Sequence, residues 1–244
     1  MSVDPDAEAL MLDMARGVFS RRCAVAMTDP RSEYPGLWPD ESLAIATARP
    51  KRRREFAAGR AAVRRAMRAL DLPAAAVPQG HDRAPVWPPG TTGSISHCDM
   101  ACIAVLALVG DAVSLGVDIE PDTPLEPELW PAICTPPERD RLSALPVAQR
   151  GRMAKLLFCI KEAAYKCQYP LSREIIDFDR LEVTPDLVGG TFAARFTAPT
   201  GPFGKDHVLG GRFARGGGLI LAGMILPPGA DRGAMANGGS PWRP

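Results

Sequence analysis

The sequence has no long hydrophobic stretch and no basic residue close to its N-terminus. The apolar run Ala101–Val109 is well short of the roughly 20 residues that a transmembrane helix requires. The first residues carry acids, among them Asp4, Asp6 and Glu8, whereas a secretory signal begins with positive charge. We therefore expect a cytoplasmic protein without a membrane partner.

The sequence also lacks a CxxC pair, although it contains six cysteines and three histidines. His97-Cys98 followed by Cys102 offers the residue types of part of a zinc site, but no second ligand pair has a suitable spacing. Several cysteines stand in apolar segments, where a free cysteine packs as a small hydrophobe. A zinc site is therefore disfavoured.

What is present is an ordinary globular composition with an uneven distribution of charge. The 244 residues are 46% apolar and 23% charged, enough to bury a core in one large domain or two small ones. The net charge of +1 conceals two regions of opposite sign. Residues 49–68 contain nine basic residues and one acid, and residues 117–140 contain seven acids and one basic residue. The first region suits anions and the second suits cations.

Periodicity and turn signals predict two rounds of helix followed by strands. We expect helices over residues 6–16, 50–70 and 147–168 and from 136, and strands over residues 23–28, 93–97, 101–109, 113–119, 180–184, 190–197, 207–215 and 218–226. This order indicates an α+β protein whose two similar halves, residues 1–115 and 116–226, meet near residue 115. The last residues, 227–244, are rich in Gly and Pro, and we expect them to be disordered.

Two acidic motifs carry most of the functional information. In Gly116-Val117-Asp118-Ile119-Glu120, two carboxylates stand two residues apart in an apolar strand, so both point to the same side of the sheet. In the helix predicted over 147–168, Glu162 and Lys166 share one face. Separately, these could be a solvated strand end and an ordinary surface pair. Together, three carboxylates and a lysine suit a hard divalent cation that holds a phosphate ester.

The basic helix predicted over 50–70 presents several arginines beside an apolar stripe. At 100° per residue, Arg53, Arg60 and Arg64 fall along the edge of the buried side. One guanidinium group can donate two parallel hydrogen bonds to the oxygens of a phosphate. A row of arginines along a helix is, however, also typical of a solvated face or a nucleic-acid surface. The strand over 93–97 ends with Ser96 and His97, which can donate hydrogen bonds to a phosphate or a base.

These motifs, taken in order, resemble those of the 4′-phosphopantetheinyl transferases, in the branch typified by the enterobactin-synthase-associated and mycobacterial enzymes. The matching segments span about residues 20–226 and are Arg52-Arg53-Arg54-Glu55-Phe56 with Arg60, Pro85-Val86-Trp87-Pro88, Gly93-Ser94-Ile95-Ser96-His97-Cys98, Gly116-Val117-Asp118-Ile119-Glu120-Pro121, and Phe158-Cys159-Ile160-Lys161-Glu162-Ala163-Ala164-Tyr165-Lys166 with Tyr169-Pro170 after it. Five motifs in this order and spacing are far more specific than any one of them.

The resemblance implies a fold of two pseudo-symmetric α/β halves with coenzyme A in the cleft between them. It implies that Mg²⁺, or Mn²⁺, is held against the pyrophosphate by Asp118, Glu120 and Glu162. Lys166 would contact the same phosphates. The 3′-phosphorylated adenosine end would be bound by Arg52, Arg60 and His97, with Ser96 nearby.

The chain departs from the resemblance at Gln79-Gly80, where relatives often carry a lysine before the glycine. Arg83 or Arg53 would then supply the missing positive charge. The helical wheel favours Arg53 for the groove and the motif match favours Arg52, so this choice stays open.

The implied reaction is the transfer of 4′-phosphopantetheine to a serine of an acyl or peptidyl carrier protein, with release of adenosine 3′,5′-bisphosphate. Glu162 would take the serine proton and Lys166 would stabilise the leaving phosphate. We expect a monomer. The sequence does not distinguish a fatty-acid, polyketide or nonribosomal-peptide carrier.

Two other functions compete with this one. A nucleic-acid-binding module could use the basic helix, but it would leave the three carboxylates unexplained, and we expect no nucleic-acid partner. A coenzyme A-binding protein that has lost transfer is disfavoured because Asp118, Glu120 and Glu162 are all present.

Overall fold

The computed structural model describes residues 5–34 and 36–229 of the chain. The first six elements are α1 (Pro5–Val18), β1 (Ala24–Thr28), α2 (Pro39–Leu43), α3 (Pro50–Ala69), β2 (Thr91–His97) and β3 (Cys102–Leu108). They are followed by β4 (Ser114–Pro121), η1 (Pro127–Leu129), α4 (Trp130–Ile133), α5 (Pro136–Ser143), α6 (Val147–Ser172), η2 (Phe178–Arg180), β5 (Leu181–Asp186), β6 (Thr191–Phe196), β7 (Val208–Gly216) and β8 (Leu219–Leu226).

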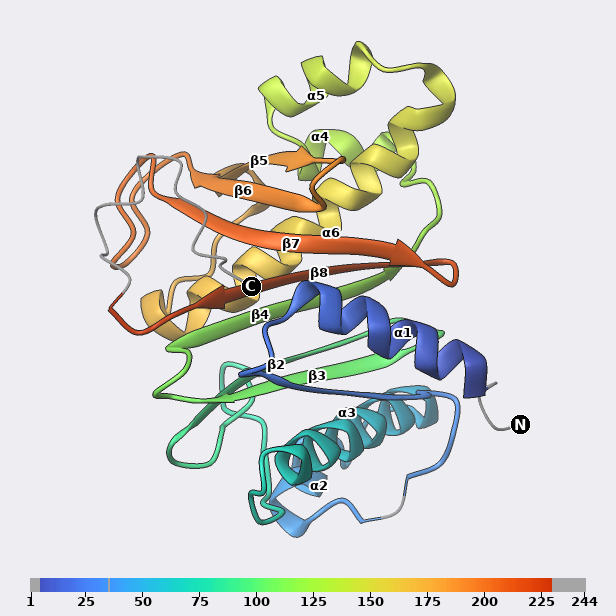
Figure 1. Ribbon diagram of the computed structural model, residues 1–244, viewed down its shortest axis with the longest axis vertical. Coiled ribbons are helices and arrows are strands. Elements are labelled where there is room, and N and C mark those ends of the chain that lie inside the picture. The colour runs from blue at the N-terminus through green and yellow to red at the C-terminus, as the bar shows by residue number, and fades with distance from the viewer. Residues whose placement is uncertain (1–4, 35, 230–244) are drawn as a thin grey trace.

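The strands form two antiparallel sheets that adjoin where β2 meets β4. One sheet has the order β1-β3-β2, and the other has the order β4-β8-β7-β6-β5. In Figure 1 the smaller sheet lies with α3 in the lower part of the molecule and the larger sheet lies above it. The serine hydroxyls of β2 join the two sheets. Ser94 Oγ accepts the Val117 N–H at 3.1 Å, and Ser96 Oγ accepts the Ile119 N–H at 3.4 Å.

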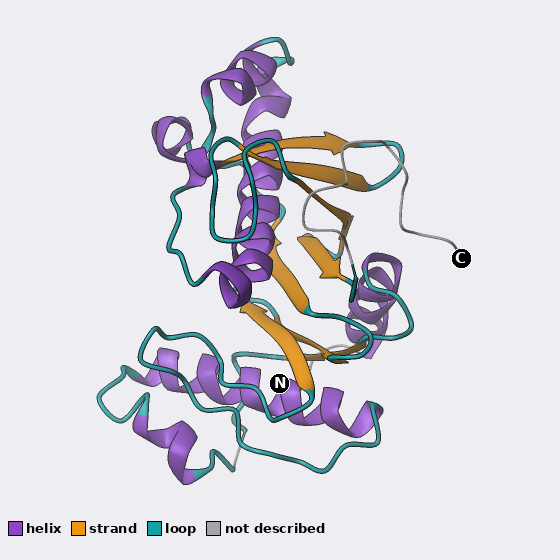
Figure 2. Ribbon diagram, turned by 90° about the vertical axis from the view of Figure 1, so that its left-hand side faces the viewer, coloured by secondary structure: helices purple, strands orange, loops and turns teal. Residues whose placement is uncertain are grey.

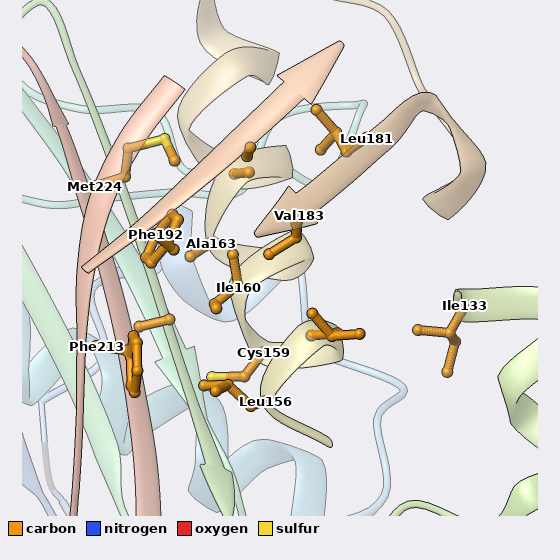
Figure 3. Packing of buried hydrophobic residues seen from close by; sticks show 14 of the residues in the cluster. Ile133, Leu156, Cys159, Ile160, Ala163, Leu181, Val183, Phe192, Phe213 and Met224 are labelled. Carbon is orange, nitrogen blue, oxygen red and sulfur yellow. The ribbon is translucent and has the colours of Figure 1, made fainter. Parts of the chain in front are cut away.

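Each face of the larger sheet has its own hydrophobic core, because side chains alternate along a strand. On β8, Ile220, Ala222 and Met224 belong to the core beneath α6. Leu219 and Leu221, which point to the other face, belong to a second core that includes α1. Figure 3 shows the α6 core at close range, and in Figure 2 the helices flank the strands. A third core lies between α3 and the smaller sheet.

Helix α1 begins the chain yet packs against β7 and β8 of the larger sheet as well as β1. A Cβ atom at Gly223 of β8 would lie 2.4 Å from side-chain atoms of Val18 and Phe19. The absence of a side chain there allows this close approach. Helix α1 therefore ties the beginning of the chain to the larger sheet, which the order of elements in the sequence does not indicate.

The structure confirms the α+β class and the order of the predicted helices and strands. The short helices α2 and α4 were not predicted, since each is about one turn long and carries little periodicity. Within the described residues, no helix is long and apolar enough to cross a bilayer. Of the tail predicted to be disordered, residues 230–244 lie outside the described residues.

Candidate active site

A cleft of about 900 Å³ lies along the line where the two sheets meet. Its walls come from α3, the loop before β2, strands β2 and β4, and one face of α6. Ten of the predicted site residues line it, namely Arg52, Arg60, Gln79, Arg83, Ser96, His97, Asp118, Glu120, Glu162 and Lys166. Segments more than 100 residues apart in the sequence thus contribute to one cavity.

The acidic wall depends on an unusually close approach of α6 to β4. A Cβ atom at Gly116 would lie 2.0 Å from the Ala163 carbonyl oxygen, so only glycine fits there. Because alternate residues of a strand share a face, Asp118 and Glu120 point to the same side as Gly116, which is toward α6. The helix in turn carries Glu162 and Lys166 on its cleft face. The glycine of the first acidic motif therefore brings the strand acids beside the helix acid.

Asp118 forms the centre of a small polar network at the bottom of the cleft. Its Oδ1 accepts hydrogen bonds from the Lys166 ammonium at 2.6 Å and the Ser96 hydroxyl at 2.6 Å. Burial alone would lower the pKa of Lys166, but the charge of Asp118 and its hydrogen bond outweigh burial and raise it. The lysine is therefore a cation at neutral pH. The single hydroxyl hydrogen of Ser96 is donated to Asp118 Oδ1, so Ser96 belongs to this network. Its contact with a phosphate stays a prediction.

Burial and like charge act together on the other two carboxylates. Burial raises the pKa of Glu120, and the neighbouring Asp118 raises it further against the opposing effect of Lys155, whose ammonium lies 3.1 Å from Glu120 Oε2. Burial also raises the pKa of Glu162, while Lys166 opposes this shift and the other two acids add to it. Three carboxylates that repel one another across one cleft favour the binding of a cation.

The structure gives two observations on whether these acids fit a divalent cation. Asp118 Oδ2 is buried without a hydrogen-bond partner among the described residues, and such an orphaned carboxylate oxygen is a suitable ligand for a hard cation. Against this, no three His, Cys, Asp or Glu side chains in the described part of the chain are gathered closely enough to hold a metal ion. Two of the three carboxylates are instead paired with lysines: Glu120 with Lys155 and Asp118 with Lys166. These ion pairs account for the separation between the carboxylates. The oxygen donors fit the ion chemically, but their present rotamers do not form a finished site.

The cleft is also lined by basic side chains of α3, Arg52 and Arg60. Arg52 Nη1 lies 2.8 Å from His97 Nε2. A guanidinium only donates hydrogen bonds, so Nε2 accepts and the imidazole is neutral with its proton on Nδ1. Burial lowers the pKa of His97, Glu55 opposes this shift, and Arg52 adds to it. Arg52 and His97 therefore act as one unit at the mouth of the cleft.

Arg60 is more deeply buried than the helical wheel predicts. Its side chain is 6% exposed, its Nε donates to the Val77 carbonyl at 2.8 Å, and its guanidinium carbon lies 3.8 Å above the Phe56 ring. The loop that contains Val77 covers a side of α3 that the wheel leaves open. Arg60 is thus held rigidly at the cleft wall, and one N–H of its guanidinium group, at Nε, already donates a hydrogen bond.

The structure places Arg52 and Arg53 in different surroundings. Arg53 donates hydrogen bonds to the carbonyls of Ala46 and Ala48. It lines a separate pocket together with Tyr34 and Ile45. The prediction that Arg53 faces the groove is therefore wrong, because the wheel gives the angle of a side chain on α3 but not the element that covers it.

Several cleft residues were given no role in the sequence analysis, although Tyr165 and Tyr169 stand in a matching motif. Lys155, Tyr165, Tyr169 and Arg173 all lie on α6 or at its end, and Asp82 lies in the loop before β2. The helical spacing of Lys155, Glu162, Tyr169 and Arg173 places them on one face, so periodicity extended from Glu162 would have found them. Asp82 could not be found in this way, because its contacts are tertiary.

Comparisons with known proteins agree with this geometry. The model of the 4′-phosphopantetheinyl transferase N-terminal domain matches residues 40–107, and that of the 4′-phosphopantetheinyl transferase superfamily matches residues 114–210. The chain is 38% identical over 206 residues to 4′-phosphopantetheinyl transferase Svp of Streptomyces mobaraensis, covering 82% of this chain and 83% of that protein. It is 33% identical over 193 residues to 4′-phosphopantetheinyl transferase Npt of Nocardia iowensis, covering 78% and 84%. It is also 33% identical over 213 residues to 4′-phosphopantetheinyl transferase PptT of Mycobacterium tuberculosis, covering 83% and 92%.

The cleft and these matches define a group-transfer enzyme with an anionic co-substrate. The chain belongs to the 4′-phosphopantetheinyl transferase superfamily. The family uses coenzyme A as substrate and acts on carrier proteins. The resemblance drawn from the motifs is confirmed.

Proposed function

We propose that this protein transfers the 4′-phosphopantetheine group of coenzyme A to a serine of an acyl or peptidyl carrier protein in a Mg²⁺-dependent reaction, and that adenosine 3′,5′-bisphosphate leaves. The observation that carries this proposal is that three carboxylates and Lys166 line the same cleft as Arg52, Arg60 and His97. We also propose that residues 1–115 and 116–226 are the halves between which the cleft lies. A location in the cytoplasm and a monomeric state complete the proposal.

The proposed metal ligands are Asp118, Glu120 and Glu162, whose oxygens match the preference of Mg²⁺. When bound, Mg²⁺ neutralises negative charge on the pyrophosphate. Mn²⁺ could take the same ligands. The partnerless Asp118 Oδ2 and the raised pKa values of Glu120 and Glu162 support this assignment.

The chain's own residues can handle the proton and the phosphate charge. The serine oxygen of the carrier would form a bond to the phosphorus that bears pantetheine, and the bond from this phosphorus to the oxygen of the bisphosphate would break. Glu162 would accept the serine proton, directly or through a water molecule, and its raised pKa makes it a better base than an exposed carboxylate. An ammonium has three N–H donors, and Lys166 uses two on Ser96 and Asp118. The third would stabilise a phosphate oxygen.

The basic side chains of the cleft would receive the 3′-phosphorylated adenosine. Arg52, Arg60, Arg83 and His97 line the cleft together with Gln79. The Gln79 amide donates to the Arg83 carbonyl at 3.0 Å, so it helps to shape the loop and offers no positive charge. Because Arg83 lines the cleft and Arg53 lines another pocket, we propose that Arg83 replaces the cation that Gln79 does not supply.

We further propose that the basic helix α3 is not a nucleic-acid surface. Three of its arginines are turned toward the protein: Arg60 is buried, Arg64 pairs with the buried Glu41 at 3.0 Å, and Arg65 donates to the Met27 carbonyl at 2.7 Å. Electrophoretic mobility assays at several salt concentrations would test this. Tight binding with a steep salt dependence would contradict it.

One experiment separates the proposal from its alternatives. The protein is incubated with an apo acyl carrier protein, coenzyme A and Mg²⁺, and the carrier is weighed by mass spectrometry while the nucleotide product is identified by chromatography. We expect a mass increase of one phosphopantetheine and the release of adenosine 3′,5′-bisphosphate, both abolished by EDTA and restored by Mg²⁺.

The Glu162→Gln variant tests the site within the same assay, with Glu128→Gln on the exposed surface as the matched control. We expect turnover to collapse in the first and to persist in the second, with little rescue of the first by added Mg²⁺. Wild-type turnover of Glu162→Gln would show that the site is wrong. Binding of coenzyme A by the wild-type protein without any transfer would favour the inactive alternative.

A further inference from the structure

The last turn of α6 touches the loop before β2 across one end of the cleft. Tyr169 Oη donates to Asp82 Oδ2 at 2.9 Å, and Arg173 Nη1 lies 3.4 Å from the same oxygen. The three residues line the cleft beside Gln79 and Arg83. This contact joins the two sides of the cleft, since Asp82 precedes β2 and Tyr169 follows β4. The roles proposed above do not use it.

Asp82 lies in a tight hairpin that is internally fixed. The Gly80 N–H donates to the Ala84 carbonyl at 2.8 Å, and Asp82 Oδ1 accepts the Ala84 N–H at 3.0 Å. Arg83 has a φ of 66°, a backbone conformation that residues other than glycine rarely adopt. With Oδ1 occupied inside the hairpin, Asp82 presents Oδ2 to α6. The hairpin can therefore move Arg83 and Gln79 only as a unit.

The opposite partner is a helix end that is weakly held by its own helix. Pro170 has no N–H, so the turn that bears Tyr169 and Arg173 lacks one intrahelical hydrogen bond to the turn that bears Lys166. Arg173 ends the helix with a φ of 59°, and its N–H donates to the Tyr169 carbonyl at 2.9 Å. Residues held in such conformations persist where the surroundings fix them, and they cluster at functional sites. Side-chain contacts therefore help to fix this turn, among them the local bond of Ser172 to Gln168 and the bonds of Tyr169 and Arg173 to Asp82.

We propose that Asp82, Tyr169 and Arg173 form a clasp across the cleft, which positions the hairpin 79–85 so that Arg83 meets the 3′-phosphate of the co-substrate. This proposal rests on the function proposed above for the cleft. The three residues are positioning residues, because they act through Arg83 and the loop rather than on the reacting phosphorus. Opening the clasp would leave the carboxylates and Lys166 in place but let the hairpin drift away from the nucleotide.

The test measures the dissociation constants of coenzyme A and dephospho-coenzyme A by calorimetry, in the presence of Mg²⁺, beside the carrier assay. Tyr169→Phe removes only the hydroxyl, and Asp82→Asn removes the charge. We expect each variant to weaken coenzyme A binding about tenfold, corresponding to the loss of one hydrogen bond to a charged group. The dissociation constant of dephospho-coenzyme A should change little. The ratio of the two dissociation constants, which measures the preference for the 3′-phosphate, should therefore fall about tenfold as well. The double variant should be weaker than either single variant by much less than the sum of the two effects, because both substitutions act on the Tyr169–Asp82 contact.

Asp206→Asn is the matched control, since it also deprives an arginine, Arg195, of a carboxylate partner but lies outside the cleft. It should bind both ligands as the wild type does. Wild-type affinity and preference in Tyr169→Phe and Asp82→Asn would overturn the clasp, even if the wild-type protein modifies the carrier. Equal weakening for both ligands would also overturn it, since a general structural loss would act on both. If the wild-type protein binds coenzyme A but modifies no carrier, the proposed function fails while the clasp can still stand on the binding data.

Discussion

Helix α6 carries two lysine–carboxylate pairs only five residues apart, and they have opposite characters. Lys161 Nζ lies 2.7 Å from Glu138 Oε2, and the two side chains are 1% and 0% exposed. Lys166 Nζ lies 2.6 Å from Asp118 Oδ1, and the side chains are 26% and 4% exposed. The two distances are nearly equal, so the distance within a pair does not distinguish a structural ion pair from one in a functional site.

The difference lies in how completely each pair is satisfied. Lys161 also donates to the carbonyls of Ile133 and Phe178, and Glu138 also accepts the N–H groups of Thr135 and Val183. That network binds α4, α5, η2 and β5 to α6. Asp118, by contrast, keeps one buried oxygen without a partner among the described residues. A closed polar network holds a fold together, whereas an incomplete one is suited to a ligand.

The largest change, a loss of stability, is expected when one partner of the fully buried Lys161–Glu138 pair is removed. Lys161→Ala should lower the free energy of unfolding by about 3–5 kcal/mol, because it leaves Glu138 as an uncompensated buried charge. Denaturant titration measures this loss. A single variant as stable as the wild type would erase the distinction between the two pairs.

The next effect concerns the open pair and should appear in turnover rather than in stability. Lys166→Ala should slow single-turnover transfer by roughly 10²–10³-fold, the scale of losing one donor to a developing oxyanion, which is about 2.7–4 kcal/mol. Lys166→Arg should recover only part of it, since a planar fork does not replace a compact ammonium. A loss of stability as large as that of Lys161→Ala, with normal transfer, would reverse the assignment of the two pairs.

A smaller change in stability is expected from Asp118→Asn. The substitution weakens the bond to Lys166 but relieves repulsion from Glu120 and Glu162, so the unfolding free energy should stay within about 1 kcal/mol of the wild type. Calorimetric unfolding at neutral pH measures it. Glu138→Gln in the closed pair is the comparison and should cost several times more. Equal costs would show that the cleft network is as closed as the buried one.

The smallest effect is a shift in the titration of His97. Its pKa is lowered chiefly by burial, so it should titrate below 6.5 in the folded protein. The unfolded chain then binds a proton first as pH falls. The contribution of His97 to stability is therefore complete above pH 6.5 and declines between 6.5 and its folded pKa. Proton NMR of the imidazole would follow it, and adenosine 3′,5′-bisphosphate should raise this pKa because its phosphates favour the imidazolium. If adding the nucleotide left the pKa of His97 unchanged, the prediction that His97 contacts the nucleotide would be wrong.

Much of the cleft could be predicted from the sequence because its residues follow local periodicity. Asp118 and Glu120 share a face of β4 and point toward α6, as the two-residue spacing requires. The roles of these residues as ligand and base remain predictions. The order of strands within the larger sheet and the position of α1 depend on long-range packing, which periodicity does not contain.

The residues that were misplaced show the same limit. Arg53 and Arg52 are neighbours on α3, and only the tertiary contacts of Arg53 with Ala46 and Ala48 turn it away from the cleft. Ser96 has the chemistry of a phosphate donor, and its hydroxyl donates a hydrogen bond to Asp118 of another strand. In both cases a local pattern gave the right residue type and a distant segment determined its partner.

The serine hydroxyls that join β2 to β4 have a consequence for solubility. Each of these strands is the last of its own sheet, and a bare sheet edge is a template for pairing with other chains. Ser94 and Ser96 occupy two of the β4 amides that such pairing would use. The two edges therefore shield each other only while both halves are present. A fragment cut between β3 and β4 would expose both edges, and each piece should aggregate at concentrations at which the intact chain stays dispersed.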